Sequence, residues 1–215
     1  MFIGHIGVGL AFKKADKDIN VAWPIFFSLL PDLLLGIFVL LGIEKVIIPP
    51  DFNQKRYLEF VFPYSHSLTA TIIWASLIFF GFFSLVKTGR RLKYALIFSC
   101  SFILHFVCDV IEHVRGLPVY FNSSYNIGFG LWNNIQLSLI LELLLFGTGL
   151  YLYLSASKGK GRKEKYGLPL FLGVIAGAAV AGQIKSPTPP DQITVAFSWL
   201  IQNIVIVPIV YWLDR

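Results

Sequence analysis

The stretch H-F-V-C-D-V-I-E-H, residues 105–113, lies inside an apolar run that begins near Ala95. On a helix, positions i, i+4, i+7 and i+8 share one face. That face carries two imidazoles and two carboxylates, from His105, Asp109, Glu112 and His113. These groups are ligands for first-row metal ions, already at helical spacing. In a soluble protein the same pattern also fits an exposed polar face at a helix end, so the rest of the chain must decide between the two interpretations.

The composition is that of a membrane protein. Of the 215 residues, 56% are hydrophobic and only 14% are charged, and the mean hydropathy is +0.70. Soluble domains carry roughly a quarter charged residues. Ionisable groups inside a membrane are costly and usually functional, which favours a functional interpretation of the stripe. The net charge of +6 comes from short segments between apolar runs, so it does not indicate nucleic-acid binding.

Apolar runs long enough to cross a bilayer define the expected fold. We expect six spans, at 20–43, 67–86, 94–114, 132–154, 167–184 and 193–213. Residues 1–12 are apolar but too short to span, and we expect a short helix there without a cleavable signal peptide. The predicted fold is an all-α polytopic helix bundle with one membrane domain over 1–215. Residues 1–115 would form the half that holds the metal site, and 116–215 a loop, the fourth span and two scaffold helices.

Basic residues predict the orientation. Segments 13–18, 87–93, 158–165 and 214–215 hold three, four, five and one Lys or Arg, whereas 44–65, 115–131 and 185–192 hold three, one and one. The first set should be cytoplasmic in a bacterial inner membrane, which places the far end of the stripe near the outer leaflet. His5 must then reach upward on a re-entrant helix, or the number of helices expected at the N-terminus is wrong. Cys100 and Cys108 lie about 12 Å apart along one predicted helix, so they cannot bond to each other within it.

Three further candidate ligands lie outside the stripe. His5 sits between Gly4 and Gly7, where backbone or substrate could approach closely, although a histidine near a terminus is often incidental. We expect Pro24 and the pair Pro31-Asp32 to interrupt the first span. Asp32, at mid-depth, should face protein, water or a cation, or else cap the helix that follows a proline kink. His66 opens the second span, and neighbouring serines could cap the helix or hold its second ring nitrogen.

The polar groups outnumber the ligands of a closed structural zinc site. With Glu142 inside the fourth span, eight candidates are available, which suggests two metal ions, or one metal and an acid/base pair. Asp109 could bridge two metals, and Glu112 or Glu142 could act as a general base. We also predict substrate contacts from Ser65, Trp132 and Arg115. Arg115 could clamp a phosphate or simply anchor the helix at the interface.

A family resemblance rests on four motifs in order. These are G-H-I-G-V-G-L (4–10), L-L-P-D-L-L (29–34), Y-S-H-S-L (64–68) and residues 105–113. Together they resemble small bacterial inner-membrane proteins described as metal-dependent hydrolases, which include a LexA-regulated branch. Their order also resembles the all-helical zinc-dependent phospholipase C and nuclease superfamily. The resemblance implies metal binding by His5, Asp32, His66, His105 and Asp109, with His113 as a further candidate. No histidine follows His113, so the three-metal set of the soluble enzymes is incomplete here.

Three functions remain open from the sequence. The first is a metal-dependent hydrolase, using one or two ions such as zinc, that cleaves a lipid-linked phosphoester near the outer leaflet. The second is a transporter for a divalent cation or protons through the same residues. The third is a non-catalytic membrane protein whose polar residues hold helices together. The oligomeric state leaves no trace in the sequence.

Overall fold

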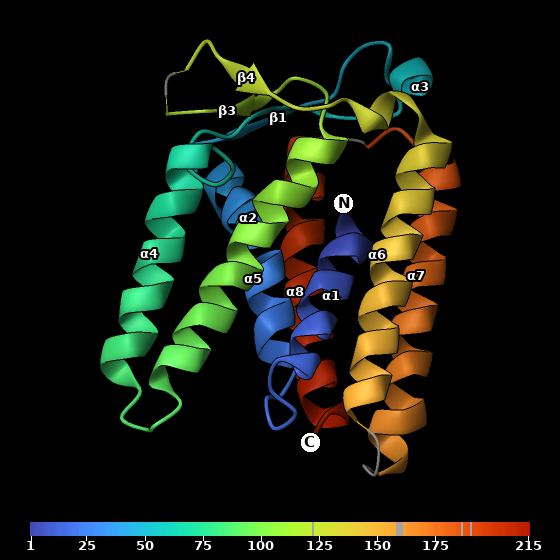
Figure 1. The fold of residues 1–215 in the computed structure, drawn as a ribbon. Coiled ribbons are helices and arrows are strands. Elements are labelled where there is room, and N and C mark those ends of the chain that lie inside the picture. Colours follow the sequence, from blue (N-terminus) through green and yellow to red (C-terminus); the bar gives the residue numbers. More distant parts are fainter. Residues whose placement is uncertain (122, 158–160, 186, 190) are drawn as a thin grey trace.

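The computed structural model describes residues 1–121, 123–157, 161–185, 187–189 and 191–215. Within them the chain forms an all-α bundle (Figure 1), as predicted. The long helices are α2 (Ala22–Leu40), α4 (Leu68–Leu85), α5 (Arg91–Glu112), α6 (Ile135–Ala156), α7 (Leu168–Lys185) and α8 (Gln192–Leu213). The short elements are α1 (Phe2–Ala11), η1 (Phe12–Lys14), α3 (Phe52–Lys55), η2 (Leu131–Asn133) and the π-helical turn η3 (Lys163–Gly167).

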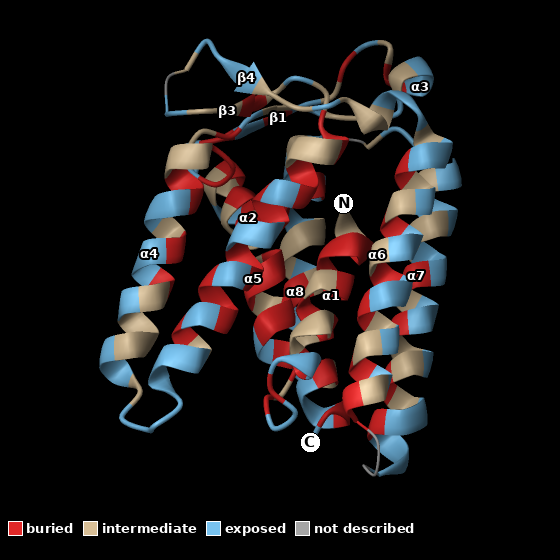
Figure 2. Cartoon of the chain, in the orientation of Figure 1, coloured by how far each residue is buried: buried red, intermediate tan, exposed pale blue. Residues whose placement is uncertain are grey.

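The six long helices match the six predicted spans. Each is long and apolar enough to cross a membrane, counting η3 with α7. Their outward faces carry large exposed apolar side chains such as Phe80, Leu144 and Ile204, and buried residues gather on the inward faces of α1, α2 and α5 (Figure 2). The chain is thus built as a multi-pass membrane protein. Of the basic segment 158–165, residues 158–160 lie outside the described part of the chain.

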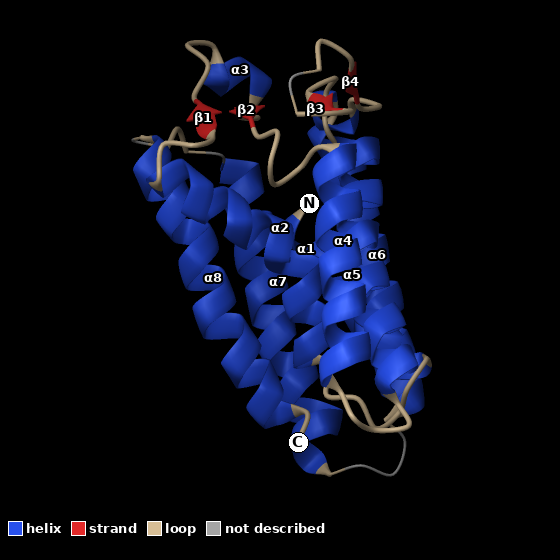
Figure 3. Ribbon diagram, turned by 90° about the vertical axis from the view of Figure 1, so that its left-hand side faces the viewer, coloured by secondary structure: helices blue, strands red, loops and turns tan. Residues whose placement is uncertain are grey.

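The two ends of the bundle differ in structure. The "loop end" carries two small antiparallel sheets and α3, as Figure 3 shows. One sheet pairs β1 (Lys45–Ile47) with β2 (Glu59–Val61), and the other pairs β3 (Leu117–Pro118) with β4 (Asn126–Ile127). The opposite "basic end" holds segments 13–18, 87–93 and 214–215 (Figure 1).

Helix α1 enters the bundle from the basic end and stops short of the loop end. The N-terminus lies among the other helices, and η1 follows α1 at the basic end (Figure 1). Ile3, Ile6 and Leu10 are fully buried in a core shared with α2, α6, α7 and α8. This is the re-entrant helix that the basic-residue pattern demands, and it raises His5 toward the middle of the bundle.

Polar side chains begin three of the spans at the loop end. Ser67, Asn134 and Asp191 accept hydrogen bonds from the backbone N–H groups three residues ahead, at the starts of α4, α6 and α8. Such caps satisfy amides that a helix leaves unpaired in its first turn. Helix α2, by contrast, runs continuously through Pro31. The prolines do not interrupt this span, contrary to the sequence-based expectation, although Pro31 cannot donate a backbone hydrogen bond.

Candidate metal centre

Four helices deliver the predicted ligands to one place. His105 and Asp109 lie one turn apart on α5, His66 precedes the first turn of α4, and Asp32 follows Pro31 on α2. His5 comes from α1. All five side chains are buried except Asp32, whose side chain is 20% exposed. The structure therefore brings together the residues that the resemblance implies.

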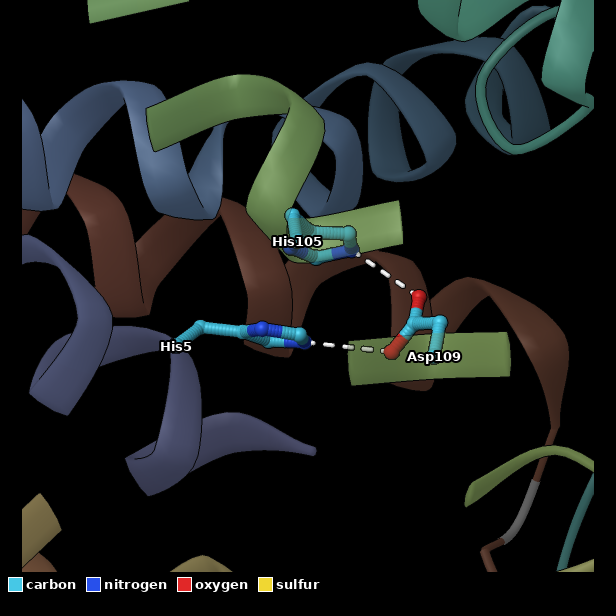
Figure 4. Close-up of side chains that lie close together, drawn as sticks. All are labelled: His5, His105 and Asp109. Carbon is cyan, nitrogen blue, oxygen red and sulfur yellow. Dashed lines mark ion pairs between the residues drawn. The ribbon is translucent and has the colours of Figure 1, made fainter. Parts of the chain in front are cut away.

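The Asp109 carboxylate is the centre of the cluster. Its Oδ1 lies 3.2 Å from His5 Nε2, and its Oδ2 lies 3.1 Å from His105 Nε2, contacts that Figure 4 shows. Oδ2 also lies 3.6 Å from His66 Nε2 and 3.9 Å from His113 Nε2. All four histidines of the chain thus direct Nε2 at one carboxylate.

The backbone fixes the orientation of His105. Its Nδ1 lies 2.6 Å from the Ser28 carbonyl oxygen, which can only accept, so Nδ1 carries the hydrogen. In the neutral imidazole the lone pair is then on Nε2, toward Asp109. The Ser28 hydroxyl donates to the His5 carbonyl oxygen at 2.7 Å. One residue of α2 therefore positions both α1 and α5 at the site.

A relay from Glu44 fixes the orientation of His66. The Ser65 hydroxyl donates its single hydrogen to Glu44 Oε2 at 2.6 Å, and it lies 2.8 Å from His66 Nδ1. Nδ1–H must therefore donate to Ser65, which leaves the lone pair on Nε2. Glu44 also accepts the backbone N–H groups of Tyr64 and Ser65, at 2.7 and 2.9 Å. Of the two serines proposed for this role, Ser65 holds the ring and Ser67 caps the helix.

The resulting cluster consists of acceptors that face acceptors. His66 Nε2 and His105 Nε2 lie 3.2 Å apart, and Asp32 Oδ1 lies 3.6 and 3.9 Å from them. Lone pairs and carboxylates at these distances repel one another unless a cation lies between them. Ligand atoms about 2.0–2.1 Å from a tetrahedral ion would lie roughly 3.3 Å apart. Asp32, His66 and His105 therefore offer three ligand atoms close enough together to hold one ion, and three protein ligands leave one position of a four-coordinate ion for water.

A second group of candidate ligands shares His105 with the first. His5, His105 and Asp109 also offer ligand atoms close enough together to hold an ion. The His5 and His105 rings stack at 3.7 Å, and His5 Nδ1 has no hydrogen-bond partner among the described residues. The Met1 nitrogen lies 3.9 Å from Asp109 Oδ1. Asp109 belongs to this second group, and its bridging of two ions stays a prediction.

Glu112 and Glu142 lie at the border of the cluster, engaged with other groups. Glu112 accepts hydrogen bonds from Trp132 Nε1 at 2.7 Å and from the Ser138 hydroxyl at 2.8 Å. Glu142 accepts from the Ile3 backbone N–H at 3.0 Å and from Gln183 Nε2 at 2.8 Å. The first of these caps the N-terminus of α1. Both carboxylates therefore support the helices that carry the site.

His113 ends α5 and forms the aromatic rim of the site. Its ring lies 4.0 Å from that of Trp132, and Phe60 and Phe62 pack beside it. Burial lowers the pKa of His113 to about 3, despite the opposing charge of Asp109. A neutral imidazole can serve as a ligand or as a hydrogen-bond partner.

A cavity of about 400 Å³ leads from the cluster toward the loop end. Asp32, His66, Asp109 and His113 line its floor. Its other walls include Arg56, Tyr57, Phe60, Trp132, Glu142 and residues of α7 and α8. Arg115 instead lines a neighbouring cavity of about 280 Å³, which shares Trp132 and His113 with the first. A volume of this size is typical of small-molecule sites.

No protein-family model, curated protein or solved structure matches this chain. Sequence reasoning missed Glu44 and Arg56, because both stand in a polar loop without periodicity. It also assigned α7 and α8 to scaffold only, whereas Gly182, Gln183 and Trp199 line the cavity. The amides of these late helices were the available signal, since polar side chains in a span often face protein or water.

Proposed function

We propose that the protein is a membrane-embedded metal-dependent hydrolase that cleaves a phosphoester carried by a lipid. The supporting observation is the convergence of Asp32, His66 and His105, three acceptors within reach of one ion, beside Asp109 at the floor of a cavity. The donor set suits zinc, which would be held by this group or by the overlapping group of His5, His105 and Asp109, and three protein ligands leave a coordination position for water. The order of the motifs, which resembles zinc-dependent phospholipases, agrees with this proposal.

The chemistry follows from the donor set and the cavity. Zinc in such a site lowers the pKa of bound water to about 7 and polarises a phosphoryl oxygen. Asp32 is the ligand carboxylate most open to the cavity, so it would orient the attacking water. Ser65 and Ser28 keep the two imidazoles aimed at the centre. The aromatic rim from Phe60, His113 and Trp132 would exclude bulk water from the reacting bond.

The transporter alternative needs a path beyond the site. Toward the basic end, the described chain fills the space with fully buried Ile6, Leu10 and Ile25. The site therefore resembles the end of a closed cavity more than the middle of a passage.

Metal analysis of the purified protein tests the proposal. We expect one or two equivalents of metal in the wild type and loss of metal in His105→Ala and Asp109→Asn. The metal affinity should fall by more than the about 10–100-fold that is typical when a hydrogen-bond partner of a ligand is removed. Glu59→Gln, an exposed carboxylate of the loop end, is the control and should keep the metal. Phosphate or phosphoalcohol release from phospholipid vesicles should follow the metal content. A metal-free wild type, or metal flux into liposomes without lipid turnover, would contradict the proposal.

A further inference from the structure

The geometry points to a phospholipid as the substrate, bound with its phosphate at Arg56 and with an acyl chain leaving the cavity sideways between α7 and α8. This inference rests on the proposed function for the location of the reacting bond. It adds a route by which the lipid reaches the cavity, and a residue, Arg56, that binds the phosphate of the headgroup. Two separate features of the cavity wall carry it.

The first feature is the wall formed by α7 and α8. Ala179, Gly182 and Gln183 of α7 and Trp199 and Gln202 of α8 line the cavity. Gly182 is also exposed, and a Cβ added there would meet nothing within 4 Å. We place the sideways opening of the cavity at this uncovered glycine of its wall.

Nearer the basic end, both helices contribute side chains to the buried core. Leu172 and Ala176 of α7 and Ile206 and Val210 of α8 belong to one buried core. The side opening is thus confined to the half of the membrane next to the loop end, at the depth of the metal centre. Small side chains at 179 and 182 leave space for a hydrocarbon chain, whose remaining length would stay in the bilayer.

The second feature is the charge of the cavity wall. Asp32, Asp109 and Glu142 are acidic, and Arg56 is the one Lys or Arg side chain among the described lining residues. Its guanidinium makes no ion pair or hydrogen bond with the described residues. An unpaired guanidinium opposite a metal-binding cluster is suited to a phosphate, which both would attract.

Arg56 has a backbone conformation that is unfavourable for a residue other than glycine. Its φ is +58°, in the left-handed region, where it ends α3 and donates its N–H to the Phe52 carbonyl oxygen. Glycine would adopt this conformation more readily than arginine. The arginine side chain is therefore kept where glycine would stabilise the turn, which argues for a function of the side chain over the cavity.

Two matched substitutions separate the features. Gly182→Leu should close the side opening, whereas Gly177→Leu on the same helix also meets open space but does not line the cavity. Arg56→Gly should relieve the backbone and remove the charge, whereas Arg56→Lys keeps the charge. Lys45→Gln controls for loss of a basic residue at the same end of the bundle, since Lys45 is exposed and lines neither cavity.

Native mass spectrometry of the full chain in detergent can count retained ligand. The three probes are phosphatidylglycerol, diacylglycerol without phosphate, and glycerol phosphate without acyl chains. We expect phosphatidylglycerol to be retained best, with at least about tenfold weaker retention in Gly182→Leu and Arg56→Gly. Gly177→Leu, Arg56→Lys and Lys45→Gln should stay within about twofold of the wild type.

The outcomes separate this inference from the proposed function. Equal retention in Gly182→Leu and Gly177→Leu, or equal binding of glycerol phosphate and phosphatidylglycerol, would overturn the lipid route even if the protein binds metal and hydrolyses phosphoesters. Selective retention that depends on Arg56 and position 182 supports the lipid route, even if the metal analysis fails. Arg56→Gly should also unfold at no lower temperature than the wild type, so that a loss of retention cannot be attributed to misfolding.

Discussion

The hydrogen atom of one hydroxyl group orients a metal ligand in this protein. Ser65 gives its hydrogen to Glu44 and must therefore accept from His66 Nδ1. Replacing Ser65 by Ala would leave Glu44 buried with fewer donors and release the His66 ring. The partners that orient ligating histidines are generally worth about 10–100-fold in metal affinity.

We therefore predict that Ser65→Ala weakens metal binding by about tenfold or more without abolishing it. Glu44→Gln should have a similar but smaller effect, because the amide can still accept from Ser65. Ser76→Ala, which removes a hydroxyl bonded within α4 far from the site, should leave the affinity unchanged. Titration with a competing chelator measures all three. Equal affinity in Ser65→Ala and the wild type would show that His66 is oriented by packing alone.

At the level of single residues the sequence predicted the ligands better than their partners. His105 and Asp109 follow from helical spacing, and the ordered motifs added His5, Asp32 and His66. The roles of Glu112 and Glu142 depend on which way α6 faces, which one sequence does not specify. Glu44 reaches His66 only through the fold of a loop, and Arg56 reaches the cavity only through a left-handed turn. Neither leaves a periodic pattern.

Helix α1 is held at its depth by glycine contacts with α6. A Cβ on Gly7 would lie 2.4 Å from the Leu145 carbonyl oxygen, and one on Gly149 would lie 2.0 Å from the Gly7 carbonyl oxygen. These neighbours are backbone atoms, so they cannot turn aside as a side chain could. Such close backbone contact is typical of small residues at membrane helix interfaces.

We predict that Gly149→Ala destabilises the protein by about 1–3 kcal/mol, because α1 and α6 must separate. Gly147→Ala in the same helix meets nothing within 4 Å, and it should be neutral or slightly stabilising because alanine favours a helix. Thermal unfolding in detergent compares the two. Since α1 carries His5, Gly149→Ala should also weaken any binding that uses His5. Equal stability of the two variants would contradict the contact.

Among the elements, the six spans were predictable and their contacts were not. Hydropathy located each span within a few residues, and the basic-residue pattern required a re-entrant α1. The prediction that Pro31 interrupts α2 was wrong, since the helix continues from Ala22 to Leu40. The participation of α7 and α8 in the cavity depends on rotation about their axes, which their nearly uniform hydrophobicity leaves unspecified.

A buried ion pair at the basic end joins η1 to the residue that follows α8. Lys13 Nζ lies 2.8 Å from Asp214 Oδ2 and donates to the Ile19 carbonyl oxygen at 2.6 Å. Asp214 also accepts from the Tyr153 hydroxyl at 2.9 Å and from the Val21 backbone N–H at 2.8 Å. This network joins η1, α2, α6 and the residue after α8.

We predict that Lys13→Met destabilises the protein by about 3 kcal/mol or more, since it leaves Asp214 buried without its cation. Lys13→Met combined with Asp214→Asn should recover part of that loss, because no unpaired charge remains. A double-mutant cycle of unfolding free energies measures the coupling. Additive effects of the two substitutions would show that the pair contributes little.

The order of the ligands along the chain has a consequence for biosynthesis. Asp32, His66, His105 and Asp109 come from α2, α4 and α5, all of which are translated before α6. The packing of α1 in the bundle requires Gly149 and Phe146 of α6 and core residues of α7 and α8. We therefore expect Asp32, His66, His105 and Asp109 to come together during translation. His5 should join them last, when the second half of the chain has inserted. A ribosome-stalled intermediate that ends before residue 135 would then capture metal without His5.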